Sequence, residues 1–149
     1  MMIRPAVAAD LPAILALLAD DPLGKNREAP AEERAAYDLA FAAIAVDPNN
    51  LMVVMEAEKR IVGCCQITFI PGLSRKGAWR GQIESVRIAA DHRNRGEGAA
   101  LMAWAIAECR RRGCALVQLT TDKRRPAAHR FYERLGFVAS HEGMKLELQ

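Results

Sequence analysis

The chain has 149 residues and a formal net charge of +3, and charged residues make up 26% of it. This length is typical of one domain with its own core, and the small positive charge is too weak to indicate nucleic-acid binding by itself. No apolar run reaches the ~18 residues that a membrane-spanning helix needs, and the N-terminus is too polar for a secretory signal. We therefore expect a single cytoplasmic domain over residues 1–149, with no membrane partner.

The first half of the chain predicts a strand, two helices and a hairpin. A short strand over 2–7 is followed by apolar residues at helical spacing. The charged, proline-containing stretch 20–30 is typical of a loop, and a second helix is expected to begin at its end. Apolar runs over 51–57 and 61–70, separated by three polar residues, predict a hairpin.

The second half predicts a strand–helix–strand unit. A strand is expected over 82–90, followed by a helix from about Gly98 to Gly113 and a strand over 115–121. The two strands of such a unit are parallel. The remaining elements are a helix over 126–136 and a final hairpin over 137–148. The element order is therefore β-α-α-β-β-β-α-β-α-β-β, which is an α/β arrangement.

Cysteine and histidine spacing gives no sign of a metal site. The four cysteines form no CxxC pair, and two of them are adjacent in the sequence. Free cysteines are among the most buried residues, so we expect four buried thiols rather than ligands or nucleophiles.

The stretch HRNRGEGAAL, residues 92–101, predicts an anion site. Glycines before a helix let a phosphate approach the backbone, and the helix start offers unpaired N–H groups. The stretch lacks the lysine of a Walker A loop, and leucine stands where a dinucleotide turn has its third glycine. The pyrophosphate of coenzyme A is the remaining candidate.

Two motifs resemble one family. Arg93-x-x-Gly96-x-Gly98 matches the Q/R-x-x-G-x-G/A motif of the GNAT N-acetyltransferase superfamily, and RFYERLGF at 130–137 matches its second hallmark. The resemblance covers the whole chain, because the element order is that of the GNAT fold. It implies a mixed, twisted sheet of about six or seven strands with about four helices. It also implies an enzyme that transfers an acetyl group from acetyl-CoA to a primary amine of a small molecule, and it is compatible with a homodimer.

The resemblance implies a set of residues that bind acetyl-CoA. They come from the strand, the turn, the helix start and the loop before the last helix: Val86, Arg87, Ile88, Arg93, Asn94, Arg95, Gly96, Glu97, Gly98, Ala99 and Arg125. Asn94 tolerates turn conformations. Glu97 adds a negative charge, so its side chain is expected to point to solvent, as is that of His92.

The strand over 82–90 changes its alternation. Ile83 is odd-numbered, whereas Val86 and Ile88 are even-numbered, and a β-bulge would absorb the slip. The resemblance implies that this bulge splays the strand from its parallel neighbour and admits the pantetheine arm. A strand that is buried on both faces, with no bulge, is the alternative.

Acetyl transfer to an amine needs a proton acceptor and a proton for the departing thiolate. Glu84 is the candidate base, placed in phase with Val86 by the slip; alternatively it pairs with Arg80 or Arg87. Tyr132 is the candidate acid by resemblance; alternatively it only packs the helix. No cysteine or serine sits with an obvious base, so we expect direct attack of the amine.

The sequence does not identify the amine acceptor. Asp20, Asp21 and Glu28 could attract a cationic amine, and Arg27 and Arg80 could equally bind a substrate carboxylate. A non-catalytic acyl-CoA-binding regulatory domain is the first rival to the enzyme. A nucleic-acid module that uses the basic clusters 110–112 and 123–125 is the second, but an aromatic content of 5% supplies few stacking platforms.

Overall fold

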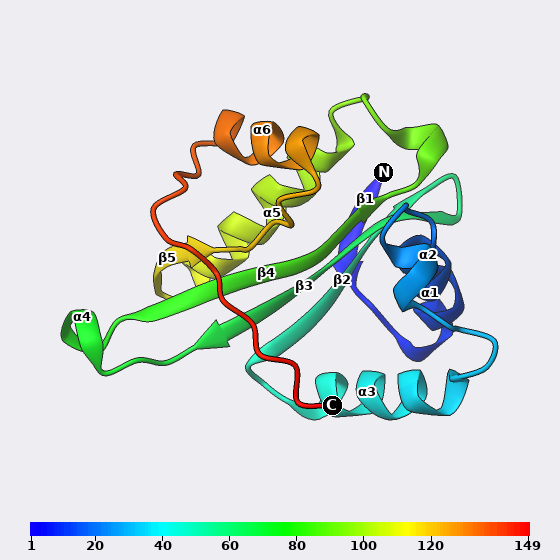
Figure 1. The fold of residues 1–149 in the computed structure, drawn as a ribbon, viewed down its shortest axis with the longest axis horizontal. Helices are drawn as coiled ribbons and strands as arrows, with labels where there is room; N and C mark the ends of the chain where they lie inside the picture. Colours follow the sequence, from blue (N-terminus) through cyan, green and yellow to red (C-terminus); the bar gives the residue numbers. More distant parts are fainter. The chain divides into compact units, whose positions relative to one another are not determined.

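The computed structural model describes residues 1–149, which divide into two units, Met1–Gln118 and Leu119–Gln149. The first unit is built on a five-stranded sheet in the order β1-β2-β3-β4-β5 (Figure 1). Its strands are β1 (Met2–Pro5), β2 (Asn50–Ala57), β3 (Arg60–Ile70), β4 (Trp79–Ile88) and β5 (Cys114–Gln118). Its helices are α1 (Leu11–Ala19), α2 (Gly24–Arg27), α3 (Arg34–Val46), α4 (Ser74–Gly77) and α5 (Glu97–Arg111).

The sheet is mixed. Strands β1 to β4 are antiparallel to their neighbours, whereas β5 runs parallel to β4. The expected hairpin is confirmed as β2 and β3, and its turn places Glu58 and Lys59 at positive φ. The parallel β4–α5–β5 unit is confirmed as well.

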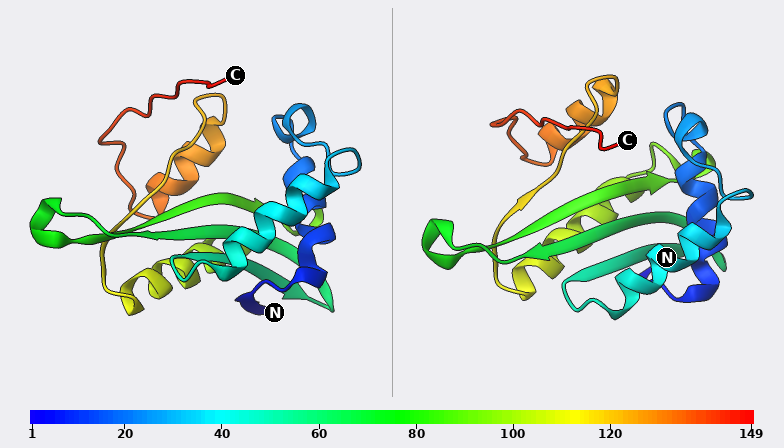
Figure 2. Two further views of the ribbon diagram at one scale, coloured as in Figure 1. Left: turned by 90° about the horizontal axis from the view of Figure 1, so that it is seen from below. Right: turned by 60° about the horizontal axis from the view of Figure 1, so that its bottom comes forward.

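Helix α5 packs on one face of the sheet (Figure 2). Its buried apolar residues recur at helical spacing, which gives it one apolar face; they are Leu101, Met102, Ala105 and Cys109. At Gly81 in β4 a methyl group would overlap the Sγ of Cys109, so this glycine lets the helix lie close to the strand. The strands beneath are apolar on this face, with Ile67, Phe69 and Ile83 almost fully buried.

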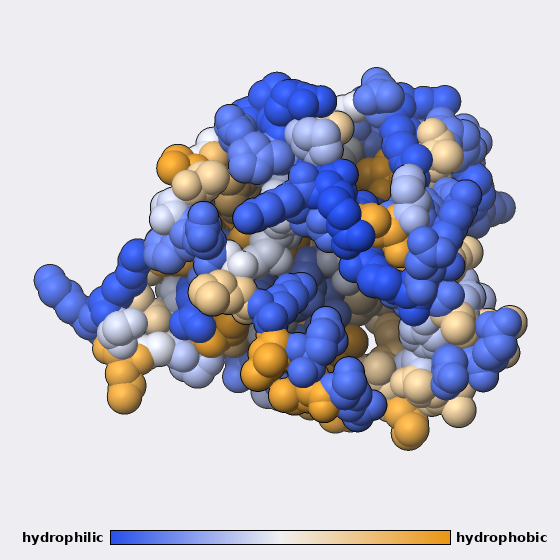
Figure 3. All heavy atoms as spheres, in the orientation of Figure 1, coloured by the Kyte–Doolittle hydropathy of each residue, from blue (hydrophilic) through white to orange (hydrophobic).

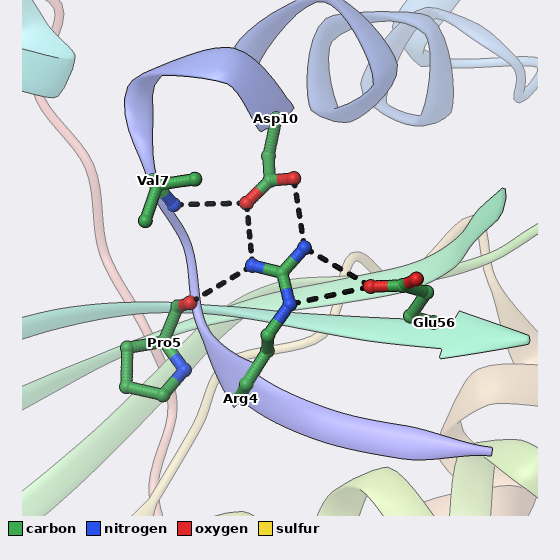
Figure 4. Close-up of polar contacts among 5 residues, drawn as sticks. All are labelled: Arg4, Pro5, Val7, Asp10 and Glu56. Atoms are coloured by element: carbon green, nitrogen blue, oxygen red, sulfur yellow. Dashed lines mark hydrogen bonds and ion pairs between the residues drawn. The ribbon is translucent and has the colours of Figure 1, made fainter. Parts of the chain in front are cut away.

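A charged network joins β1, β2 and the start of α1 (Figure 4). The Arg4 guanidinium donates to both Asp10 oxygens at 2.8 and 3.0 Å and to Glu56 at 3.1 Å. Asp10 also accepts the N–H of Val7 at 2.8 Å and is 8% exposed. The hydrogen bonds from Arg4 hold the pKa of Asp10 below its ordinary value, against the opposing effect of burial.

The expected strand count is wrong. The sheet has five strands rather than six or seven, and no strand follows Gln118, so the hairpin expected over 137–148 does not form. The alternating apolar residues that suggested it, Met144, Leu146 and Leu148, are 86–94% exposed. A two-stranded hairpin whose apolar face stays uncovered is marginal at best.

The helix count also differs from the expected four, since the structure has six α-helices and two short 3₁₀ turns. Two of the six have only four residues: α2 lies in the stretch 20–30 that was expected to be a loop, and α4 has positive φ at Arg75 and Lys76. Helix α4 lies at the tip of the long β3–β4 connection, where Leu73 is 97% exposed and apolar surface shows in Figure 3. None of the helices is long and apolar enough to cross a bilayer.

The second unit contains one helix, α6 (Pro126–Arg134), at the position expected from the sequence. It begins with a proline, which is favourable in a first turn, and Gly136 at φ 98° closes it. Before it, Arg124 binds both oxygens of Asp122 at 3.0 and 2.7 Å.

The Asp10 network generates a stability prediction. Asp10→Asn keeps the shape but removes the charge that faces Arg4, so we expect the free energy of unfolding to fall by about 1–3 kcal/mol at pH 7. Because the folded-state pKa of Asp10 is lowered, its stabilisation is present above the ordinary pKa of 3.8 and is lost as the pH falls below it. Urea unfolding between pH 7 and pH 2 should therefore show the two proteins converging in acid.

The matched control is Asp38→Asn. Asp38 pairs with Arg34 at 3.1 Å on the surface of α3, with 55% of its side chain exposed. An exposed pair of this kind contributes about 0.5 kcal/mol or less, so the control should stay close to the parent at every pH. Equal effects of the two substitutions would contradict the role given to Asp10.

Candidate functional site

Strand β4 contains a bulge at the position that the sequence predicts. Gln66 of β3 faces Glu84, and Cys64 faces Arg87, so the register slips by one residue between these two pairs. Ser85 takes up the slip with a φ of 55°, a left-handed conformation that a non-glycine residue seldom adopts. The alternative of a regular strand is wrong.

The bulge changes which residues share a face. Gln66 and Cys64 lie two apart on a regular stretch of β3, so their partners Glu84 and Arg87 project from the same face of the sheet. The expectation that Glu84 is in phase with Val86 is therefore wrong, because the extra residue sits after Glu84 rather than before it.

Beyond the bulge, β4 presents a main-chain edge away from β3. The β4–β5 ladder ends at Gln82 and Gln118, whereas β4 continues to Ile88. The N–H of Ala89 donates to Val62 of β3 at 2.8 Å, so the alternate residues Val86 and Ile88 direct their main-chain groups to the other side. An extended ligand could pair with this edge as a further strand would.

Arginine side chains bind the two carbonyls of this edge. Arg87 Nη1 donates to the Val86 carbonyl at 2.9 Å, and Arg93 Nε donates to the Ile88 carbonyl at 3.0 Å. Arg93 also reaches the Asp20 carbonyl at 3.2 Å. Both arginines of the turn, Arg93 and Arg95, are exposed, and Arg93 links the end of β4 to the segment after α1.

The turn after β4 leads straight into α5. Asn94 and Gly96 both have positive φ, 62° and 81°, as the expected turn chemistry requires. No side chain caps the helix start, so the first N–H groups of α5, at Glu97, Gly98 and Ala99, lie outside the helix's own hydrogen bonding. A Cβ built on Gly96 meets no heavy atom within 4 Å, so the space beside it is open to a ligand.

Glu97 and His92 do not point to solvent, contrary to expectation. Glu97 is 8% exposed, and its carboxylate lies 2.8 Å from His92 Nδ1. The helix dipole favours a carboxylate in the first turn, and the imidazole supplies it with a partner. The carboxylate is thereby held within the turn, against His92.

Glu84 lies on a polar stretch of the sheet face. It is exposed and makes no ion pair, so the alternative of a pair with Arg80 or Arg87 is wrong. Its neighbours carry amide and hydroxyl groups that bind one another: Thr68 and Gln66 donate to Asn50 at 2.9 and 3.2 Å, and Gln118 donates to Gln82 at 2.9 Å. Sequence reasoning missed these residues, although Gln66 and Thr68 alternate with buried apolar ones.

Tyr132 and Arg125 belong to the second unit. The Tyr132 ring makes edge-to-face contacts with Phe131 and Phe137 at centroid distances of 5.1 and 5.9 Å, which fixes it on α6. The structure therefore brings together in its first unit all the other residues expected at the site, from Glu84 to Ala99.

The remaining candidates have structural partners. Glu28 accepts the Tyr37 hydroxyl at 2.7 Å, and Asp21 pairs with Arg87 at 3.2 Å. Arg111 and Arg112 both bind Glu108 and lower its pKa to about 2, so the basic cluster at the end of α5 serves the helix itself. No group of three potential metal ligands occurs.

Burial raises the pKa of the thiols of Cys64, to about 12, and of Cys109, to about 11, which keeps them protonated and unreactive at neutral pH. Three of the four cysteines are buried as expected, and Cys114 is half-buried.

Comparison with known proteins identifies the family. The sequence profile of the Acetyltransferase (GNAT) family matches residues 11–137. The chain belongs to this family. It is accordingly an acetyl-CoA-dependent acyltransferase of the GNAT type, which confirms the resemblance carried by the two motifs.

Three relatives of this GNAT protein are informative. An aminoalkylphosphonate N-acetyltransferase of Salmonella typhimurium is 31% identical over 93% of this chain and 86% of its own. A glucosamine 6-phosphate N-acetyltransferase of Trypanosoma brucei brucei is 37% identical over 60% of this chain and 58% of its own. A crystal structure from Bacillus halodurans, described as a transcriptional regulator, is 47% identical with a TM-score of 0.95 and covers 99% of both chains.

The geometry at Gly96 predicts a binding defect that can be separated from a folding defect. Gly96→Ala forces a methyl group into the left-handed region at a cost of about 1–2 kcal/mol, and it narrows the approach of a phosphate to the backbone. We expect acetyl-CoA affinity, measured by isothermal titration calorimetry, to fall at least tenfold.

Gly113→Ala is the matched control, because Gly113 has a φ of 82° and equally open surroundings at the other end of α5. It should lower the melting temperature as much as Gly96→Ala does and leave acetyl-CoA affinity unchanged. Equal loss of affinity in both variants would argue against a phosphate site at Gly96.

Proposed function

We propose that the chain transfers the acetyl group of acetyl-CoA to the primary amine of a small molecule that carries a phosphate or phosphonate group. The observation that carries the proposal is the open edge of β4 beyond Gln82, which leads to the uncapped start of α5. An extended pantetheine arm fits the first feature, and a pyrophosphate fits the second.

The acceptor class is supported by the two curated relatives. Both are named for acceptors that combine an amine with a phosphorus oxyanion, an aminoalkylphosphonate and glucosamine 6-phosphate. In this chain Arg80 lies on the same face of β4 as Glu84, four residues earlier in the strand. If the amine of the acceptor lies near Glu84, the Arg80 guanidinium is a candidate partner for its phosphorus oxyanion.

The proposed chemistry is direct attack. The neutral amine nitrogen attacks the thioester carbonyl carbon, the carbonyl oxygen takes up negative charge, and the carbon–sulfur bond then breaks. Glu84 takes the amine's proton, directly or through a water molecule, and Tyr132 donates a proton to the departing thiolate. The main-chain N–H groups of Val86 and Ile88 are the proposed donors to the oxyanion.

A regulatory acyl-CoA-binding domain is the second candidate, because the relative from Bacillus halodurans is described as a transcriptional regulator. Such a domain needs the edge of β4 and the start of α5 but has no use for Glu84 as a base. Ligand binding is common to both functions, whereas turnover belongs to the enzyme alone.

Binding is tested first by thermal unfolding with acetyl-CoA, with ATP and NAD as controls. A ligand at about a hundred times its dissociation constant adds about 2.7 kcal/mol, which for a chain of this size raises the melting temperature by roughly 5–10 °C. We expect this rise with acetyl-CoA alone. Equal rises with ATP or NAD would indicate a general phosphate site.

Turnover is tested with 2-aminoethylphosphonate and glucosamine 6-phosphate as acceptors, following release of free thiol. We expect Glu84→Gln to lower kcat by about 10²–10⁴-fold and to leave the dissociation constant of acetyl-CoA unchanged. Glu58→Gln, in the exposed turn between β2 and β3, is the control that loses a carboxylate of the same kind. Full activity of Glu84→Gln would remove Glu84 from the mechanism, and wild-type binding without turnover of any amine would favour the regulatory domain.

A further inference from the structure

A buried ion pair joins the segment after α1 to strand β4. Asp21 Oδ2 lies 3.2 Å from Arg87 Nε, and only 6% of the aspartate side chain and 16% of the arginine side chain are exposed. Removing two charges from water is costly, and a buried pair often adds little net stability. Stability alone is therefore a weak reason for this pair to exist.

The same guanidinium also contacts the open edge of β4. Nε lies within ion-pair distance of Asp21 Oδ2 without forming a hydrogen bond to it, while Nη1 donates to the Val86 carbonyl at 2.9 Å. A planar guanidinium carries its charge and its N–H groups in a fixed arrangement, whereas the ammonium of lysine is a compact charge on a flexible stem. The negative charge of Asp21 thus lies against the same side chain that donates to the Val86 carbonyl.

Asp21 is itself held firmly. Its Oδ1 accepts the N–H of Leu23 at 2.9 Å, and its carbonyl accepts the N–H of Lys25 at 3.0 Å. At Gly24 a methyl group would overlap the Leu18 carbonyl and lie 2.7 Å from Asp21 Oδ2, so the chain folds tightly around the aspartate. The segment has the rigidity that a positioning role requires.

A second arginine, Arg93, makes a similar link between β4 and Asp20, the residue before Asp21. Arg93 donates to the Ile88 carbonyl at 3.0 Å and to the carbonyl of Asp20 at 3.2 Å. Consecutive residues of the segment, Asp20 and Asp21, are therefore each joined by an arginine to one of the two outward-facing carbonyls of β4. This repetition ties the segment to the edge itself rather than to the sheet in general.

We propose that Asp21 is a positioning residue for acetyl-CoA: through Arg87 it orients the Val86 carbonyl so that an amide N–H of the pantetheine arm can pair with it. A carbonyl oxygen has two lone pairs, so it can accept the Arg87 hydrogen bond and one from the ligand together. The proposal rests on the proposed function, which lays the pantetheine arm along this edge.

The test is the affinity of the full-length protein for acetyl-CoA by isothermal titration calorimetry, together with steady-state kinetics. Asp21→Asn removes the charge that holds Arg87, and we expect the dissociation constant and the KM for acetyl-CoA to rise about tenfold, with kcat within about twofold. Arg87→Lys should show the same split, and it serves as the second single variant if Asp21→Asn folds poorly.

Two controls separate positioning from stability. Asp10→Asn breaks another aspartate–arginine pair (Figure 4), at strand β1, which β2 and β3 separate from β4. It should lower the melting temperature without changing acetyl-CoA affinity. The double variant Asp21→Asn/Arg87→Met removes both charges, so it should recover much of the stability lost in Asp21→Asn. It also lacks the donor to Val86, so its affinity should stay low.

The proposal is overturned if Asp21→Asn binds acetyl-CoA as tightly as the wild type, or if affinity recovers together with stability in the double variant. Failure of the wild type to bind acetyl-CoA would instead overturn the proposed function itself. The two failures are distinguishable because wild-type binding is measured in the same titration series.

Discussion

The two edges of strand β4 are treated differently by the rest of the fold, and the site depends on that difference. One edge pairs with β3 from Arg80 to Ile88, whereas the other pairs with β5 only as far as Gln82. The bulge at Ser85 follows three residues after the last pair with β5, and a bulge of this kind increases the local twist of a strand. Main-chain groups that a sheet would normally satisfy are thus offered to a ligand.

Charge in this chain is used mainly to hold structure together. Arg4 joins β1 to β2 and to the start of α1, Arg87 and Arg93 join the segment after α1 to β4, and Arg112 stacks on Phe69 at 4.1 Å. A small net positive charge therefore says little about partners. The proposed anion site depends on helix N–H groups and glycine, whereas Arg87 and Arg93 donate to main-chain carbonyls of β4.

The sequence predicts those parts of the fold and the site that follow from local patterns. The alternation at Ile83, Val86 and Ile88 predicts the bulge, and the glycines around 96–98 predict the turn. The contacts of Asp21 with Arg87 and of His92 with Glu97 depend on how the chain folds back or turns on itself, which no spacing rule encodes. These four side chains were expected to face solvent or a ligand. Instead, each lies largely buried against its partner.

The final hairpin shows the opposite limit. Alternation over 144–148 is as regular as in any strand of the sheet, yet those residues form no strand. An alternating sequence allows a segment to form a strand, but whether the strand forms depends on whether another layer covers its apolar face. The alternation can be read directly from a single sequence, whereas the covering layer cannot.

The open edge of β4 also has to coexist with the other proteins of a crowded cell. An unpaired strand edge is a template for any foreign strand, and natural sheets blunt such edges with bulges and with charged side chains. Strand β4 has both features. The bulge at Ser85 interrupts its regular edge, and the guanidinium groups of Arg87 and Arg93 donate to the outward-facing carbonyls of Val86 and Ile88. A narrow, flexible pantetheine arm can follow a bulged and charged edge more easily than a regular strand with side chains on both faces. The features that line the proposed path of the ligand are therefore the same ones that natural sheets use to discourage edge-to-edge pairing.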